Sequence, residues 1–150
     1  TTALAVHPNP SRVLCIGLGD GHMAATVADD PRVKELVIVE LNASLRQVLG
    51  RTAQGKLLID SPKVRHEVAD GRRWLISNSD ERFDLILMWP LHAAHAHSGS
   101  LFSLEFLSLC RDRLTDGGIL FLRTVDAYST ARCRWPVKWV DQSMRSWGTV

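Results

Sequence analysis

The stretch RVLCIGLGDG, residues 12–21, decides the fold of this chain. Residues 12–18 form a short apolar run ending in glycines, which predicts a buried strand that closes in a tight turn. Residues 21–29, GHMAATVAD, follow with the pattern of a helix that starts at this glycine turn. A buried strand, a glycine turn and a helix in direct succession are typical of a doubly wound α/β domain.

Working outward, strands and helices alternate along the rest of the chain. Further strands are predicted over residues 35–41, 64–68, 83–88 and 119–123, and helices over residues 43–51, 71–77, 101–114 and 129–147. Such alternation predicts a parallel sheet with helices on both faces, here of five strands in the order 3-2-1-4-5. Ligands of such sheets bind beyond the carboxyl ends of the strands, so polar residues that follow strands are the candidates for a site.

Length and composition predict one globular domain over residues 1–150, and its cysteines favour a reducing, cytoplasmic location. The net charge of +2 does not favour nucleic acid or a membrane surface as partner. Three cysteines without metal-ligand spacing indicate reduced thiols and no metal site. The chain starts at Thr1 without a methionine, and too few residues follow Trp147 for further strands. We therefore expect a sheet that is truncated to about five strands. The chain could also be the soluble segment of a longer, membrane-linked protein.

Acidic residues follow the second and third predicted strands, as the glycines follow the first. Glu40 lies near the end of the second strand, where a carboxylate can accept hydrogen bonds from both ribose hydroxyls of a nucleoside. Asp70 and Gly71 come directly after the third strand, and the Asp70 carboxylate can accept from the amine of an adenine. The three strand ends together predict one adenosine-shaped pocket.

Each of these features also has an ordinary structural explanation. A glycine cluster is often only a turn, Glu40 alone could be a solvated strand end, and Asp70 alone could cap the next helix. The glycine turn also fits the fingerprint of a dinucleotide site, with Glu40 as the ribose acid. Asp20 argues against that ligand, because its charge would repel a pyrophosphate but attract the cationic amino end of an S-adenosyl ligand.

Several blocks of residues 7–124 resemble the spermidine synthase (polyamine aminopropyltransferase) family, within the S-adenosylmethionine-dependent methyltransferase-like superfamily. They are the HPNP entry before VLCIGLGDG, the strand VIVELN, the element ADGRRWL, the strand FDLILM and the block LFSLEFLSLCRDRLTDGGIL. The last block is the most specific, since ordinary methyltransferases rarely carry it. The resemblance covers about four fifths of the chain and implies the methyltransferase-type Rossmann-like fold.

The resemblance also implies a ligand and residue roles. Decarboxylated S-adenosylmethionine, or S-adenosylmethionine itself, would be held by four residues of the glycine turn, by an acid and a glycine after the third strand, and by the ends of the second and fourth strands. These residues are Gly17, Gly19, Asp20, Gly21, Glu40, Asp70, Gly71 and Trp89. The implied reaction is aminopropyl transfer to a diamine or polyamine, and no metal is implied.

One residue departs from the family pattern. The family places an Asp after the fourth strand to accept the proton of the amine, and here Trp89 stands at that position. Trp89 cannot accept a proton; it could stack on the adenine or the acceptor, or simply pack at the strand end. Three histidines follow Trp89 in the sequence, at positions 92, 95 and 97. They could supply a replacement base, for which His92 is the candidate, they could bind a metal, or they could belong to a polar loop without a chemical role.

The catalytic residue therefore stays unknown, and three functions stay open. They are an aminopropyltransferase-like enzyme, a small-molecule methyltransferase that uses S-adenosylmethionine, and a degenerate domain that binds a ligand or partner without turnover. Trp135 and Trp139 lie four residues apart on one helical face, which predicts either core packing or an interface, for instance in a homo-oligomer.

Overall fold

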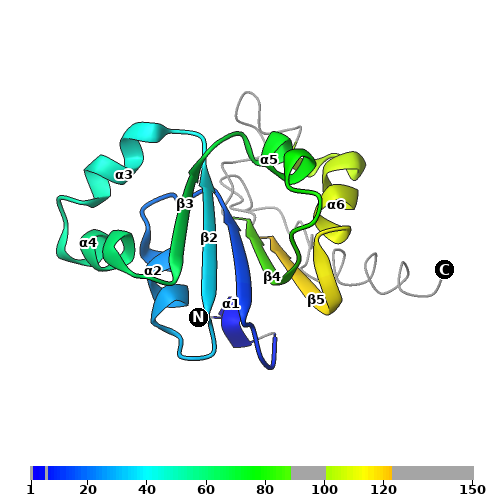
Figure 1. Cartoon of the computed structure of the whole chain (residues 1–150), viewed down its shortest axis with the longest axis horizontal. Coiled ribbons are helices and arrows are strands. Elements are labelled where there is room, and N and C mark those ends of the chain that lie inside the picture. Colours follow the sequence, from blue (N-terminus) through cyan, green and yellow to red (C-terminus); the bar gives the residue numbers. More distant parts are fainter. Residues whose placement is uncertain (1, 6, 89–100, 123–150) are drawn as a thin grey trace, which may run out of the picture.

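Five strands form one parallel sheet in the computed structural model, which describes residues 2–5, 7–88 and 101–122. The strand order is β3-β2-β1-β4-β5, as the sequence predicts. The strands are β1 (Arg12–Ile16), β2 (Glu35–Glu40), β3 (Val64–Val68), β4 (Phe83–Met88) and β5 (Leu114–Leu122). Because all of them run in parallel, their carboxyl ends share one edge of the sheet, the upper edge in Figure 1.

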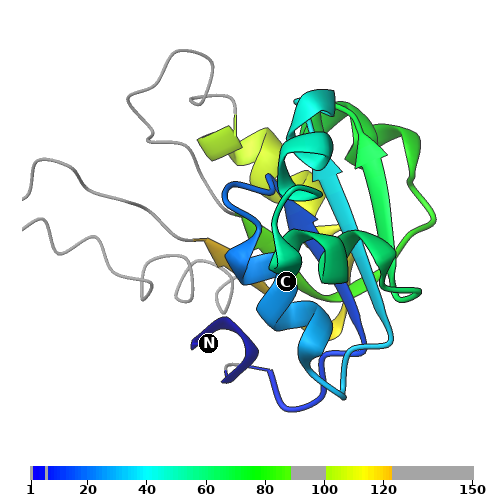
Figure 2. The ribbon, with the colours of Figure 1, turned by 90° about the vertical axis from the view of Figure 1, so that its left-hand side faces the viewer.

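Helices cover both faces of this sheet, so the domain is doubly wound (Figures 1 and 2). The helices are α1 (Thr2–Ala5), α2 (His22–Asp29), α3 (Ala43–Leu49), α4 (Ala53–Asp60), α5 (Gly71–Ser77) and α6 (Leu104–Arg111). The first face carries α2, α3 and α4, and the second face carries α5 and α6. Within the described ranges, none of the helices combines the length and the hydropathy needed to cross a bilayer.

The side chains of alternate residues in the central strands point into two separate hydrophobic cores, one on each face of the sheet. Val13 and Cys15 of β1 point into the core beneath α2 and α4, whereas Leu14 and Ile16 point into the core beneath α5 and α6. The second core also holds Cys110 of α6. Burial raises the pKa of both cysteine thiols to about 12, so both are neutral at physiological pH.

The structure corrects several predicted boundaries on the first face. β1 ends at Ile16 rather than at residue 18, because Gly17 already turns away with a φ of 85°. The helix predicted over residues 43–51 ends at Leu49, and α4 follows although no helix was predicted there. The Thr52 side chain caps α4 by accepting from the Gly55 N–H at 3.0 Å.

Boundaries on the second face also differ from the prediction. The helix predicted over residues 101–114 is shortened to α6, which Ser103 caps. Residues 115–118, TDGG, which separate the predicted helix from the predicted last strand, lie inside β5 as an irregularity: Leu114 pairs with Phe83 and Ile119 pairs with Leu85. Residues 115–118 therefore lie opposite Asp84 alone. The helix predicted over residues 129–147 lies outside the described residues.

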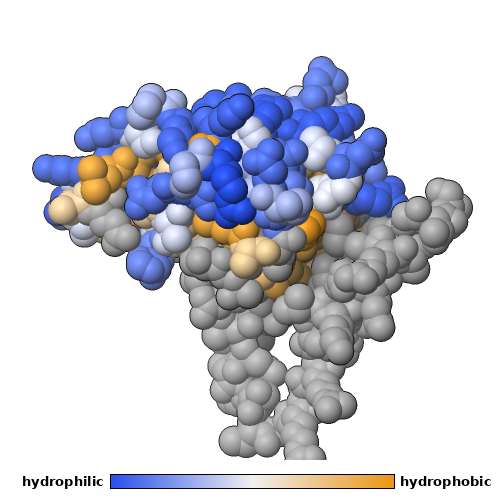
Figure 3. Space-filling view, turned by 90° about the horizontal axis from the view of Figure 1, so that it is seen from below, coloured by the Kyte–Doolittle hydropathy of each residue, from blue (hydrophilic) through white to orange (hydrophobic). Residues whose placement is uncertain are grey.

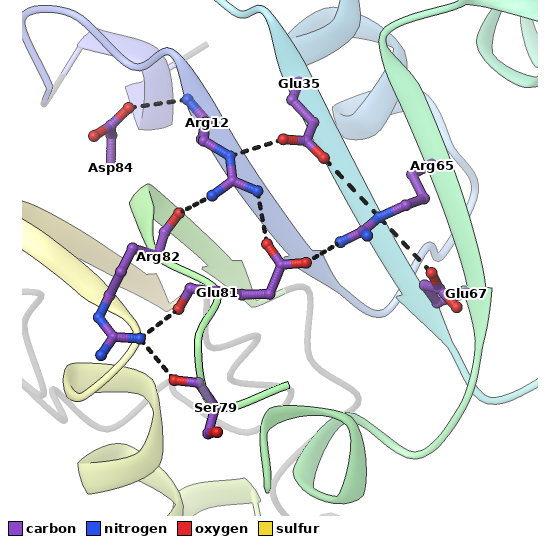
Figure 4. Close-up of polar contacts among 8 residues, drawn as sticks. All are labelled: Arg12, Glu35, Arg65, Glu67, Ser79, Glu81, Arg82 and Asp84. Carbon is purple, nitrogen blue, oxygen red and sulfur yellow. Dashed lines mark hydrogen bonds and ion pairs between the residues drawn. The ribbon is translucent and has the colours of Figure 1, made fainter. Parts of the chain in front are cut away.

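An ion-pair network, here called the amino-edge brace, joins the strands at the opposite edge from their carboxyl ends. It consists of Arg12, Glu35, Arg65 and Glu81, which come from β1, β2, β3 and the turn before β4 (Figure 4). Arg12 pairs with Glu35 at 2.7 Å and with Glu81 at 2.6 Å, and Arg65 pairs with Glu81 at 2.8 Å. Seen from this side, the described surface is largely hydrophilic (Figure 3).

Candidate functional site

The glycine turn connects β1 to α2 at the carboxyl edge of the sheet. Gly17, Gly19 and Gly21 have φ values of 85°, 56° and 76°, in the left-handed region that residues with a Cβ rarely adopt. The Gly21 N–H donates to the Leu18 carbonyl at 3.0 Å and closes the turn. Gly21 then precedes α2, so the first turn of this helix begins at the site edge.

Asp20 sits at the tip of this turn with an exposed side chain. Its Oδ1 accepts a hydrogen bond from the His22 N–H at 3.0 Å, which satisfies one of the free amides at the start of α2. The turn therefore presents an exposed carboxylate at its tip.

Glu40, the last residue of β2, directs its carboxylate at the glycine turn. Oε2 accepts from the Leu18 N–H and Oε1 accepts from the Asn42 N–H, both at 2.8 Å. The side chain is half-buried, and each carboxylate oxygen has the capacity to accept one more hydrogen bond. The Gly17 N–H donates to the carbonyl of Val39 at 2.9 Å, so main chain and side chain both join the first two strand ends.

The third strand end is tied to the second in the same way. The Ala69 N–H donates to the Glu40 carbonyl at 3.1 Å, which brings Asp70 next to the Glu40 loop. The Asp70 Oδ1 accepts from the Arg73 N–H at 2.9 Å and caps α5, so the ordinary capping role weighed from the sequence does exist. It leaves Oδ2 of Asp70 as the second acceptor atom of that carboxylate.

Gly71 allows α5 to approach the base of the glycine turn closely. A Cβ at this position would lie 2.6 Å from Cγ2 of Ile16, the last residue of β1. The structure therefore brings together the glycine turn, Glu40, Asp70 and Gly71. Trp89, His92, His95 and His97 lie outside the described residues, as do Trp135 and Trp139.

Sequence reasoning missed the two backbone amides that hold Glu40 and one contact between helices. Asn42 caps α3, because its Oδ1 accepts from the Ser44 N–H at 3.0 Å. The sequence pattern did not predict that the backbone N–H groups of Leu18 and Asn42 would donate to the carboxylate of Glu40. Arg72 Nη1 also donates to Ser103 Oγ at 3.4 Å, joining α5 to α6. Within the described part of the chain, no group of three His, Cys, Asp or Glu side chains could hold a metal ion.

The order of the strands and the acids at their ends define the class: a Rossmann-like α/β domain of the methyltransferase type, with its polar residues gathered at the carboxyl edge. The chain belongs to the spermine/spermidine synthase domain family, whose model matches residues 1–134. This confirms the resemblance drawn from the sequence blocks.

Curated relatives support the same family. The chain is 30% identical over 127 residues to a polyamine aminopropyltransferase of Thermotoga petrophila, covering 82% of this chain and 42% of that protein. It is 35% identical over 121 residues to a polyamine aminopropyltransferase of Streptococcus uberis, covering 78% of this chain and 41% of that protein. The chain thus spans less than half the length of the relatives it matches.

Solved structures agree on the fold. A spermidine synthase in complex with the transition state analogue AdoDATO superposes with a TM-score of 0.71 and 26% identity, covering 95% of this chain and 47% of that chain. Human methyltransferase-like protein 13 in complex with SAH gives a TM-score of 0.68 at 20% identity, covering 96% of this chain and 68% of that chain. The second likeness concerns the fold alone.

Proposed function

We propose that this chain binds decarboxylated S-adenosylmethionine at the carboxyl edge of the sheet and acts in aminopropyl transfer to a small amine. Membership of the family supports the proposal, as does the solved spermidine synthase bound to AdoDATO. A diamine or polyamine is the acceptor class that the relatives' names suggest. Buried, unreactive thiols at Cys15 and Cys110 fit a reducing, cytoplasmic location.

One observation carries the proposal: the half-buried carboxylate of Glu40 lies between the glycine turn and the Asp70 loop, held by two backbone amides. A carboxylate fixed in this way suits two vicinal hydroxyls, because it offers two acceptor oxygens in a rigid orientation. Asp70 lies one strand further on, where the base of a nucleoside that spans the edge would reach.

The charge of the glycine turn favours a sulfonium nucleoside over a dinucleotide. Asp20 is exposed at the tip of the turn, where a pyrophosphate would meet its negative charge. The aminopropyl group of decarboxylated S-adenosylmethionine ends in an ammonium group, which this carboxylate would attract. In S-adenosylmethionine the additional carboxylate would face Asp20 with the same sign of charge, so the decarboxylated ligand should bind more tightly.

The bound sulfonium supplies an electrophilic carbon to the reaction. A neutral amine of the acceptor forms a new N–C bond, the C–S bond breaks, and the electron pair returns to sulfur, leaving 5′-methylthioadenosine and one proton to remove. The residues of this chain would bind the nucleoside and orient it for in-line attack. With Trp89 at the position of the family Asp, the proton goes to solvent or to a nearby base, for which His92 is our candidate.

Titration calorimetry with decarboxylated S-adenosylmethionine, S-adenosylmethionine and NAD tests the ligand class. We expect the decarboxylated nucleoside to bind most tightly and NAD to bind weakly. Preferred binding of S-adenosylmethionine would point instead to a methyltransferase. Binding without turnover of any amine would point to a degenerate domain, and preferred binding of NAD would overturn the nucleoside site.

Substitutions of Glu40 test the site itself. Glu40→Ala should weaken nucleoside binding by about 1–3 kcal/mol, the range for a lost hydrogen bond to a charged group. Glu40→Gln should also weaken it, because its NH₂ group would oppose one of the two amide donors. Asp29→Ala, at the exposed end of α2, is the matched control. Unchanged affinity in both Glu40 variants would remove Glu40 from the pocket.

A further inference from the structure

The sequence contains three Asp-Gly pairs, at residues 20–21, 70–71 and 116–117. This dipeptide is chemically labile, because glycine has no side chain to hinder its own nitrogen when that atom attacks the neighbouring aspartyl carboxyl carbon. The attack requires the Asp side chain and the glycine backbone to rotate toward each other. The three pairs share the same chemistry, so their surroundings in the fold decide which of them can react.

The first pair is held in place within the glycine turn. Asp20 Oδ1 accepts from the His22 N–H at 3.0 Å. The Gly21 N–H donates to the Leu18 carbonyl, also at 3.0 Å, and Gly21 itself is buried. Both groups that would have to meet are therefore occupied by hydrogen bonds, and both bonds must open before they can react.

The second pair is held at the start of α5. Asp70 Oδ1 accepts from the Arg73 N–H at 2.9 Å and caps the helix. The backbone of Gly71 packs so closely on Ile16 that a Cβ would lie 2.6 Å from its Cγ2. Rotation of this pair would therefore break the helix cap and disturb the packing of α5 on the end of β1.

The third pair lies at the opposite edge of the sheet, in the irregular start of β5. Asp116 and Gly117 are both exposed, and a Cβ at Gly117 would meet nothing within 4 Å. Among the described residues, none donates a hydrogen bond to the Asp116 carboxylate or forms an ion pair with it. The pair also lies between the ladder positions Leu114 and Ile119, so it can rotate without separating either of them from β4.

We propose that Asp116 is a site of spontaneous isomerisation to isoaspartate in the folded protein, and that the fold protects Asp20 and Asp70 from the same reaction. The inference is independent of the proposed function, because it needs no ligand. It also separates the labile pair from the two pairs at the carboxyl edge, where the proposed nucleoside site lies.

The reaction has two steps and needs only water. The nitrogen of Gly117 loses its proton and bonds to Cγ of Asp116, the Cγ–OH bond breaks, and water leaves as a succinimide ring closes. Water then opens the ring. Attack at the γ-carbonyl restores aspartate, whereas attack at the α-carbonyl breaks the original peptide bond and leaves isoaspartate, with the main chain running through Cγ. Either product keeps one oxygen atom from the solvent.

Incubation of the folded protein in oxygen-18 water at neutral pH measures this reaction, because each opening of the ring fixes one heavy oxygen. Trypsin places the three pairs in separate peptides, residues 13–32, 66–72 and 114–123, whose labelling mass spectrometry compares. The peptide with Asp116 should gain label about tenfold faster than the other two, the factor expected when two hydrogen bonds must open first. Its isoaspartyl form should also appear as a second chromatographic peak of equal mass.

Two controls separate the effect of the fold from that of the sequence. In guanidinium chloride the three pairs should label at similar rates, because their hydrogen bonds and packing are lost. Asp116→Glu keeps the charge but lengthens the side chain, so it should abolish labelling of the 114–123 peptide. The inference is wrong if Asp116 labels no faster than the other two pairs in the folded protein, if no isoaspartyl peak forms, or if the difference persists in guanidinium chloride.

Discussion

Glu40 serves the fold and the proposed site with the same carboxylate. Its strand position was predictable, because the apolar run of β2 ends at this residue and an acid there stands out. Its amide partner at Leu18 was not predictable, since the direction of that N–H depends on the positive φ values that Gly17 and Gly19 give the turn. Its partner at Asn42 depends on how the chain turns after β2. For single residues, the chemical type of a site residue can therefore be predicted from the sequence, whereas its hydrogen-bond partners depend on the backbone geometry.

Trp89 is the residue at which the proposed chemistry departs from the family pattern. If only the missing base limits turnover, Trp89→Asp should raise aminopropyl transfer to 1,4-diaminobutane by about a hundredfold, the lower end for a positioned general base. The Asn side chain is similar in shape to that of Asp but cannot take the proton, so Trp89→Asn should give no such gain. The measurement is the initial rate of 5′-methylthioadenosine release, and equal rates in both variants would contradict the expectation.

Gly71 is required by packing rather than by backbone conformation. Gly71→Ala should destabilise the chain by about 1–3 kcal/mol, because the new methyl group would lie 2.6 Å from Ile16 Cγ2 in a close-packed core. In Gly50→Ala the nearest atom would be 3.5 Å away, so the change in the free energy of unfolding should stay within about 0.5 kcal/mol. Urea denaturation compares the two variants, and similar losses would contradict the packing explanation.

At the scale of elements, the sequence located every strand of the sheet and missed two helices, α1 and α4. Strands β1, β2 and β4 each contain an unbroken apolar run, so a strand can be recognised there even where its exact ends cannot. Helix α4 has Gly55 in its first turn, and a Cβ there would meet the Leu49 carbonyl oxygen at 2.0 Å. The same glycine that weakens the helical pattern thus lets α4 begin close behind α3, which only the tertiary structure reveals.

The amino-edge brace predicts a pH-dependent contribution to stability. The hydrogen bond from Arg65, followed by that from Arg12, lowers the pKa of Glu81 below its ordinary value of 4.5 in spite of partial burial. A carboxyl group with a lowered pKa stabilises the folded state above its ordinary pKa, and this stabilisation is lost as the pH falls through the lowered value. Glu81→Gln should therefore cost about 1 kcal/mol at pH 7 and progressively less below about pH 4.

Urea denaturation between pH 3 and pH 7 measures this difference. Glu67→Gln is the matched control, because Glu67 lies 3.7 Å from Arg65 and forms a longer ion pair than Glu81 does. It should cost less than Glu81→Gln at pH 7. A cost of Glu81→Gln that is the same at both ends of the pH range would show that its charge does not matter.

At the scale of the whole molecule, fold and family were both predictable from the sequence. Strand order followed from the alternation of elements and from the glycine turn after β1, and the family followed from blocks such as LFSLEFLSLCRDRLTDGGIL. The irregular start of β5 was not predictable, because TDGG has the composition of a free turn. Its insertion into the strand depends on Asp84, whose carboxylate accepts from Thr115 Oγ1 at 2.9 Å.

Each of the two described cores contains one cysteine, so the reactivity of its thiol reports whether that side of the sheet has opened. Cys15 lies beneath α2 and α4, and Cys110 lies beneath α5 and α6, so an alkylating reagent reaches each thiol only when its own side of the sheet opens. Mass spectrometry of iodoacetamide-treated protein should find the two sites modified at one common rate if the domain opens as a unit. Different rates would show that one helical layer detaches before the other.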